Sequence, residues 1–261
     1  MKPRFFVFCC AITLGVAGLV AAPWQPTAGA HNTAAPDTAP TQPGEDKPRP
    51  HAPASAYQPV DVLGWTLRVH DDLLADEELY EHIHGEIHHQ LFRLTRIMPA
   101  EALEFMRTVV IWIELENPYG GTAQYHPNRN WLEDNGYLTE KAHCIEISNA
   151  RNFLRYTKRS QPYVMLHELA HAYHHQHLGF GHEGVLDCYR QAKDEGLYEE
   201  VMSLTGRTVR HYALTNHKEY FAEATEALLG RNDFYPFVEG ELKAYDPRAH
   251  ALLTELWGLE R

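Results

Sequence analysis

The sequence His-Glu-Leu-Ala-His at positions 167–171 is the feature that most restricts how this chain can fold. In a helix of about 3.6 residues per turn, His167 and His171 lie about 40° apart on one face. Two imidazoles in this arrangement can bind one zinc ion, and Glu168 beside them can take a proton from a zinc-bound water. This chemistry requires a helix over the motif with its two histidines turned toward further ligands.

The residues around the motif favour such a helix. Pro162 stands where a first helical turn tolerates proline, and Gly179 is a typical helix terminator. Leu166, Ala170 and Tyr173 form an apolar stripe beside the two histidines. The alternative is a surface helix with unrelated histidines, since the chain has 18 of them.

Residues 1–22 have the pattern of a secretory signal peptide. Lys2 and Arg4 precede an apolar run from residue 5 to residue 20, and small residues follow at 20–22. The run is shorter than the ~20 residues of a membrane-spanning helix, although an uncleaved anchor is the alternative. We therefore expect a secreted or periplasmic protein that leaves the membrane once the signal is removed.

The composition changes twice along the rest of the chain. Residues 23–58 are rich in Ala, Pro and Thr and predict a disordered linker. Residues 59–261 have a mixed composition and are long enough for one globular domain.

The chain has 35 acidic and 23 basic residues, so nucleic acid and anionic membranes are poor partners.

Within this domain, predicted strands come first and helices follow. Alternating apolar residues predict strands at 64–69, 109–115 and 142–147. Helical spacing predicts, besides the helix over the motif, helices at 76–98, 149–156, 183–193, 216–229 and 239–257. The segment 117–135 is rich in Gly, Asn and Pro and predicts a loop. This order predicts an α+β domain, with a small N-terminal sheet and a mainly helical C-terminal half on either side of the active site.

Two cysteines remain after Cys9 and Cys10 leave with the signal peptide. Cys144 and Cys188 would face an oxidising compartment, where one disulfide between them is an option. The sequence does not show whether their Cα atoms come within the ~7 Å limit, so two buried thiols are an equal alternative.

A catalytic zinc ion usually has three protein ligands, so a third one is needed. His177 follows His171 at the metzincin spacing, but a continuous helix carries it about 240° around, away from the metal. Glu219 lies in the predicted helix at 216–229, and Glu223 lies one turn further on the same face. We assign Glu219 to the metal and expect Glu223 to hydrogen-bond a ligand imidazole.

These segments also carry a family resemblance. Residues 167–173 and 212–223 resemble the catalytic domain of gluzincin metallopeptidases of the anthrax lethal factor type. The resemblance implies a zincin-like fold, His167, His171 and Glu219 as ligands of one zinc ion, and Glu168 as general base. It implies Tyr212 as the hydroxyl that stabilises the transition state. The match covers only these two segments, and the chain has no large toxin-delivery domains.

The same chemistry follows from the residues themselves. Zinc would polarise a scissile carbonyl, Glu168 would move the proton, and the phenol of Tyr212, or its neighbour His211, would donate to the oxyanion. The sequence thus predicts a secreted zinc metallopeptidase that acts on peptide or protein substrates. Two alternatives are a non-catalytic exported protein that binds zinc or a partner on a zincin scaffold, and a zinc hydrolase of non-peptide amides. Glu168 and Tyr212, which a degenerate scaffold would most easily lose, favour an enzyme.

Overall fold

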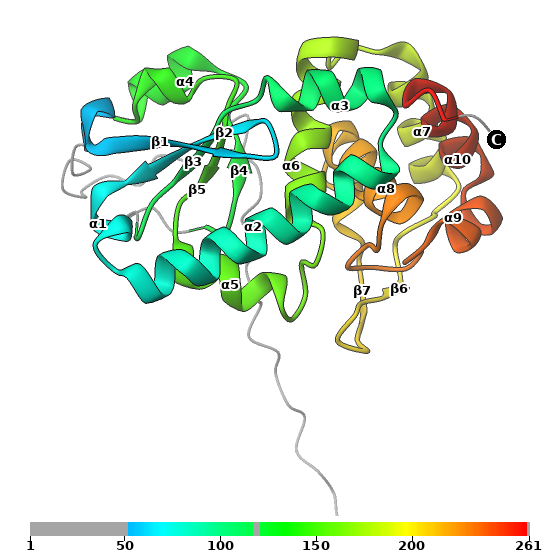
Figure 1. Cartoon of the computed structure of the whole chain (residues 1–261). Coiled ribbons are helices and arrows are strands. Elements are labelled where there is room, and N and C mark those ends of the chain that lie inside the picture. Colours follow the sequence, from blue (N-terminus) through cyan, green and yellow to red (C-terminus); the bar gives the residue numbers. More distant parts are fainter. Residues whose placement is uncertain (1–51, 117–120, 260–261) are drawn as a thin grey trace, which may run out of the picture. The chain divides into compact units, whose positions relative to one another are not determined.

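Figure 1 shows the computed structural model, which describes residues 52–116 and 121–259. The predicted signal peptide and most of the predicted linker lie outside the described residues. The linker boundary at residue 58 is wrong, because the first strand begins at Tyr57. The side chain of Tyr57 is buried and its hydroxyl donates to Glu114 Oε1 at 2.9 Å. The folded domain therefore starts before residue 59.

The larger sheet connects strands from across the N-terminal half. Its strands are β1 (Tyr57–Val62), β2 (Trp65–His70), β3 (Ile111–Ile113), β4 (Gln124–Tyr125) and β5 (Ile145–Ile147), in the order β1-β2-β3-β5-β4. The three central strands are parallel, and each edge strand is antiparallel to its neighbour. Leu63 and Gly64 join β1 to β2 with φ values of 56° and 89°. Positive φ at both positions is typical of a type I′ hairpin turn, which explains the glycine.

The sequence located the central strands and missed the edge strands. The predicted strands at 64–69, 109–115 and 142–147 correspond to β2, β3 and β5. The prediction of a loop at 117–135 is wrong in part, because β4 and the helix α4 (Arg129–Asp134) lie within it. A two-residue strand is too short to show any periodicity, so pattern analysis does not detect it.

Among the described residues, the N-terminal half also contains five α-helices. They are α1 (Asp71–Leu74), α2 (Glu77–Ile97), α3 (Ala100–Arg107), α4 and α5 (Ala150–Thr157). In α2 the Asp76 side chain accepts from Leu79 N at 3.3 Å, and Ile83, Ile87 and Leu91 are fully buried at helical spacing. This agrees with the predicted helix at 76–98. Figure 1 shows α2 and α5 below the sheet and α4 above it.

The C-terminal half is mainly helical. It contains α6 (Val164–Tyr173), α7 (Glu183–Asp194), α8 (His217–Leu229), α9 (Glu239–Tyr245), α10 (Pro247–Leu256) and a hairpin of β6 (Val201–Met202) and β7 (Thr208–Val209). The prediction of one helix at 239–257 is wrong. Asp246 ends α9 and accepts from Ala249 N at 3.1 Å, and Pro247 starts α10. The ten residues Pro247–Leu256 therefore form a second helix.

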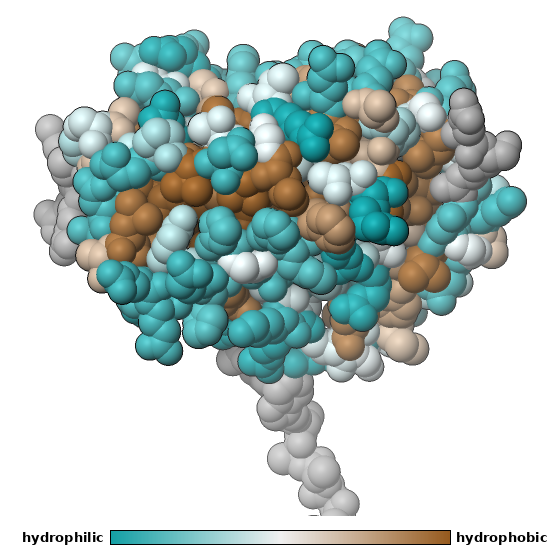
Figure 2. Space-filling view, viewed as in Figure 1, coloured by the Kyte–Doolittle hydropathy of each residue, from teal (hydrophilic) through white to brown (hydrophobic). Residues whose placement is uncertain are grey.

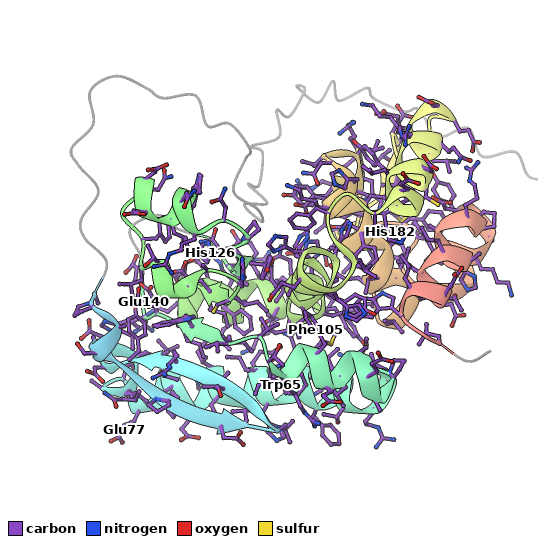
Figure 3. All side chains as sticks on the ribbon, turned by 90° about the horizontal axis from the view of Figure 1, so that it is seen from above. Trp65, Glu77, Phe105, His126, Glu140 and His182 are labelled. Carbon is purple, nitrogen blue, oxygen red and sulfur yellow. The ribbon has the colours of Figure 1, made fainter. Side chains whose placement is uncertain are left out.

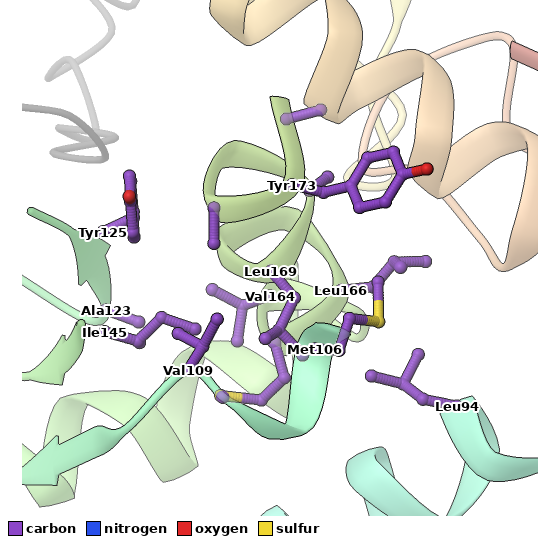
Figure 4. Close-up of a cluster of buried hydrophobic side chains, with 14 of the residues drawn as sticks. Leu94, Met106, Val109, Ala123, Tyr125, Ile145, Val164, Leu166, Leu169 and Tyr173 are labelled. Atoms are coloured by element: carbon purple, nitrogen blue, oxygen red, sulfur yellow. The ribbon is translucent and has the colours of Figure 1, made fainter. Parts of the chain in front are cut away.

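The helix α6 lies in the hydrophobic core. All ten of its residues are buried, and it packs against α2, α3, α8 and β4. Figure 4 shows Leu166 and Leu169 of α6 together with apolar side chains of other elements: Leu94, Met106, Val109, Ala123 and Ile145. Seen from above in Figure 3, the labels His126 and His182 lie on opposite sides of this helix. The class is therefore α+β, as predicted, with α6 between its sheet-bearing and helical parts.

The surface is mostly polar in the view of Figure 2. Apolar surface gathers there in a band over the β1–β2 hairpin and α2. Val60 and Leu63 of the hairpin are half-buried and pack on the core beneath. No helix among the described residues is both long enough and apolar enough to cross a membrane.

Candidate metal centre

Two helices, α6 and α8, bring the predicted ligands together. His167 and His171 lie on α6 and are both buried. Glu219 lies in the first turn of α8, where Asn216 Oδ1 accepts from Lys218 N at 2.9 Å and from Glu219 N at 3.1 Å. This cap fixes where α8 begins and therefore where the Glu219 side chain leaves the helix. Glu219 is fully buried against α6.

The three side chains converge on one point. The Oε2 atom of Glu219 lies 3.2 Å from Nε2 of His167 and 3.2 Å from Nε2 of His171. The two Nε2 atoms are 3.1 Å apart. Ligands bound to a tetrahedral zinc ion at about 2.0–2.1 Å are separated by about 3.3–3.4 Å. The spacing of the three donor atoms therefore fits a single zinc ion, and these buried His and Glu groups could hold a metal.

Electrostatics keep Glu219 in the form that binds a metal. Burial by itself raises the pKa of this carboxyl group, but the charge of His171 and the hydrogen bonds from both imidazoles lower it to about 2. Glu219 is thus ionised at neutral pH. Its second oxygen, Oε1, is buried and has no hydrogen-bond partner among the described residues.

A second carboxylate orients His167. The Nδ1 atom of His167 lies 2.7 Å from Oε1 of Glu226, which is buried. Glu223, predicted for this role, is 3.9 Å from the same nitrogen and 3.8 Å from Nδ1 of His211. The assignment of the hydrogen bond to Glu223 is therefore corrected to Glu226. At 100° per residue, Glu226 lies only about 20° from Glu219 on α8, whereas Glu223 lies about 40° away.

His167, Glu223 and Glu226 form a second set of buried groups that could hold a metal. This set shares His167 with the first but uses its Nδ1 side. With a metal bound, a proton on Nδ1 of His167 that is donated to Glu226 would leave the Nε2 lone pair free to bind the ion. The tautomer that satisfies Glu226 is thus the one that completes the first set.

The side chain of Glu168 extends from α6 to the edge strand β4 of the sheet. Its Oε2 atom accepts a hydrogen bond from Tyr125 N at 2.8 Å. Its Oε1 atom is buried and has no hydrogen-bond partner in the part of the chain that the structure describes. Burial raises the pKa of this carboxyl group, which favours a proton acceptor that works near neutral pH.

Tyr212 and His211 lie just before α8. Tyr212 begins a single 3₁₀ turn, Tyr212–Leu214, that packs on α8 and leaves the tyrosine half-buried. His211 is buried, and its Nδ1 atom accepts from Ala213 N at 3.0 Å. Burial lowers the pKa of His211 to about 3, so it stays neutral. His211 therefore caps the turn, and of the two predicted donors Tyr212 is the more accessible.

Two other sequence expectations concern residues outside this centre. His177 is exposed, and its ring stacks on Tyr173 at 4.5 Å, so it faces away from the metal ligands as predicted. Cys144 precedes β5 and Cys188 lies on α7, and both are free thiols. The disulfide alternative is not formed, because the two cysteines belong to the sheet-bearing and the helical half respectively.

Sequence reasoning missed three contributors. Glu226 had a detectable signal, since it lies seven residues after Glu219 in one predicted helix. The main-chain N–H of Tyr125 has none, because its position depends on pairing of the edge strand. The third is a buried network in which Lys141 Nζ lies 2.6 Å from Glu146 Oε1, while His126 Nε2 lies 2.6 Å from Glu146 Oε2. This network joins His126, which directly follows β4, to Glu146 of β5.

Comparison of the chain with protein-family models, with curated proteins and with solved structures gives no significant match. The assignment of this centre therefore depends on its own geometry: two histidines and a glutamate whose donor atoms converge, beside a buried glutamate with one unpartnered oxygen.

Proposed function

We propose that this protein is a secreted zinc metallopeptidase with a zincin-like fold of the gluzincin type. The observation that carries the proposal is the convergence of His167, His171 and Glu219 at zinc-ligand spacing, next to Glu168. Two neutral imidazoles and one carboxylate are a common ligand set of catalytic zinc in peptidases. Export follows from the signal-peptide pattern of residues 1–22.

Each residue then has one task. When bound, zinc supplies a Lewis acid that polarises the scissile carbonyl and acidifies a water molecule. Glu168 takes up the proton on its unpartnered Oε1 and delivers it to the leaving amine, while Tyr125 N–H holds Oε2 in place. The hydroxyl of Tyr212 donates to the oxyanion that develops on the substrate.

The sheet edge supports a peptide as the substrate. The N–H and C=O groups of His126 bond to the β5 side, at 3.0 Å to Cys144 O and 2.7 Å from His143 N. Alternation along the strand turns the main-chain groups of Tyr125 away from β5, where its N–H donates to Glu168. An edge strand beside the catalytic glutamate can pair with an extended peptide and present its scissile bond.

Glu168 also separates this proposal from the alternatives. On a scaffold that only binds zinc, a buried carboxylate with an unpartnered oxygen would cost free energy without any return in function. This favours an enzyme over a non-catalytic protein. A hydrolase of non-peptide amides would use the same residues, and the position of β4 at the edge of the sheet is the reason to prefer peptides.

The test compares the zinc-loaded full-length protein with its Glu168→Gln variant on a complex peptide library. New termini are identified by mass spectrometry, and zinc content is measured for both proteins. Cuts made by the parent and absent from the variant, at equal zinc content, support a peptidase. If both proteins hold one zinc and neither cuts any peptide, the proposal is overturned in favour of one of the alternatives.

A further inference from the structure

A chain of contacts leads from Glu168 around the metal ligands to Glu219. Tyr125, whose N–H donates to Glu168, has its hydroxyl 2.8 Å from Nδ1 of His175. The His175 ring stacks on Phe180 with centroids 4.6 Å apart. The Nζ atom of Lys218 lies 4.7 Å from the centre of the Phe180 ring. Lys218 directly precedes Glu219, so this chain of contacts, called the arc below, connects the neighbourhood of Glu168 with that of Glu219.

This arc carries positive charge and hydrogen-bond donors. The His143 ring lies 5.2 Å from His175 and its side chain is exposed. Burial lowers the pKa of His175, and the charges of His143 and Lys218 lower it further. Lys218 contributes an ammonium group to the arc. Such a cluster is notable in a chain with 35 acidic and 23 basic residues.

The contact with Tyr125 also fixes the tautomer of His175. The Tyr125 hydroxyl lies 2.8 Å from Nδ1 of His175 and can donate its proton to that nitrogen. Burial raises the pKa of Tyr125, which keeps that proton on the phenol. Neutral His175 therefore carries its hydrogen on Nε2, where it can donate to an acceptor outside the protein.

We propose that Lys218, His175 and His143 bind a carboxylate of the peptide substrate close to the scissile bond. The carboxylate is that of an acidic side chain or of the peptide C-terminus. An ammonium group and imidazole N–H groups on one rim form charge-assisted hydrogen bonds with a carboxylate, and a cationic rim attracts anionic substrates. This inference rests on the proposed peptidase function and names the class of substrate.

The test uses three peptide pools of equal length with the zinc-loaded full-length protein. The first pool is blocked at both ends and has Asn and Gln but no acidic residue. The second contains Asp and Glu instead, and the third is the first with a free C-terminus. Lys218→Met is compared with Lys158→Met, a matched change at an exposed lysine after α5.

We expect cleavage of the second or the third pool to exceed that of the first, with the cuts at a fixed distance from the carboxylate. The pool that is preferred identifies the source of the carboxylate. Lys218→Met should lower kcat/KM for that pool by about three- to tenfold more than for the first pool. Lys158→Met should change none of the three. Equal cleavage of all pools, or an equal loss on all pools in Lys218→Met, would overturn the inference and leave the peptidase proposal intact.

Binding provides a readout that does not need turnover. Fluorescently labelled pools are titrated with the Glu168→Gln protein, with and without Lys218→Met, and anisotropy is recorded. Tighter binding of a carboxylate-containing pool that depends on Lys218 supports the inference even where no pool is cleaved, an outcome that counts only against the peptidase. Equal affinity for all pools contradicts it.

Discussion

The Nδ1 atom of His167 lies 2.7 Å from Oε1 of Glu226, two helical turns beyond Glu219 on α8. One glutamate of α8 thus meets the Nε2 side of the imidazole and another meets its Nδ1 side. The helix that carries Glu219, the third proposed metal ligand, thus also orients His167, the first. A shift of α8 along its axis would disturb both contacts at once.

Glu226→Gln should weaken zinc binding. The amide oxygen can still accept from Nδ1, but the negative charge that makes the imidazole a stronger ligand is lost. Loss of such a carboxylate typically costs about 10–100-fold in metal affinity. The measurement is a competition titration of the zinc-loaded protein with a chromophoric chelator.

Glu223→Gln is the matched control, because Glu223 lies on the same helix but 3.9 Å from Nδ1. We expect it to change zinc affinity by less than about threefold. A larger loss in Glu223→Gln than in Glu226→Gln would mean that the two glutamates exchange roles.

Tyr212→Phe should reduce turnover without loss of zinc. Removal of one donor to a developing oxyanion lowers kcat by about 10²–10³, and KM should change little because the bond forms only in the transition state. Kinetics on the best-cleaved library peptide would measure this effect. Tyr80→Phe on α2 is the control, and activity of Tyr212→Phe within about threefold of the parent would assign the donor role elsewhere.

Local signals predicted much of this architecture. The helix over residues 167–171 had its histidines at i and i+4, and α2 and α8 had both helical periodicity and Asp or Asn caps. His167, His171 and Glu219 lie in predicted helices, so the spacing alone predicted on which helix face each side chain lies. The spacing did not predict that α6 packs against α8, because this contact joins segments that are distant in the sequence.

The remaining parts depend on contacts that no local pattern encodes. The two residues of β4 become a strand only by pairing with β5, and that pairing brings Tyr125 N to Glu168. Whether Glu223 or Glu226 bonds to Nδ1 of His167 depends on how α8 is rotated about its axis relative to α6. The burial of Lys141 also depends on tertiary structure, since an isolated lysine in a sequence normally indicates surface.

Lys141→Met should strongly destabilise the sheet-bearing half. Lys141 is fully buried and pairs with Glu114 and with Glu146. Burial alone raises the pKa of Glu146, but the hydrogen bond from His126 and the charge of Lys141 hold it well below its usual range. Without Lys141 these carboxylates lose their ammonium partner in the interior, which typically costs about 3–5 kcal/mol.

Urea denaturation followed by tryptophan fluorescence would measure the loss in Lys141→Met. Arg190→Met removes an exposed ion pair with Asp187 and should cost at most about 1 kcal/mol. The double variant Lys141→Met/Glu146→Gln should recover part of the loss, because one buried charge is removed with its partner. A cost below about 1 kcal/mol in Lys141→Met would show that water reaches the network.

His174→Leu should make the protein less sensitive to acid. His174 is fully buried among Phe180 and Phe221, and its ring nitrogens have no hydrogen-bond partner within residues 52–116 and 121–259. Burial lowers its pKa to about 3, whereas an unfolded histidine titrates near about 6.5. Between these values the unfolded chain binds more protons, so stability falls as the pH drops through this window.

The loss from one such histidine approaches roughly 1.4 kcal/mol per pH unit below its unfolded pKa. Between about pH 7.5 and pH 5, His174→Leu should therefore lose about 2 kcal/mol less than the parent. Both proteins are unfolded with urea at the two pH values at equal excess zinc, so that any change in metal binding with pH affects them alike. His211 has the same shift in pKa and remains in both, so the difference reports His174 alone. Parallel losses in the two proteins would mean that His174 reaches solvent or a proton acceptor in the folded state.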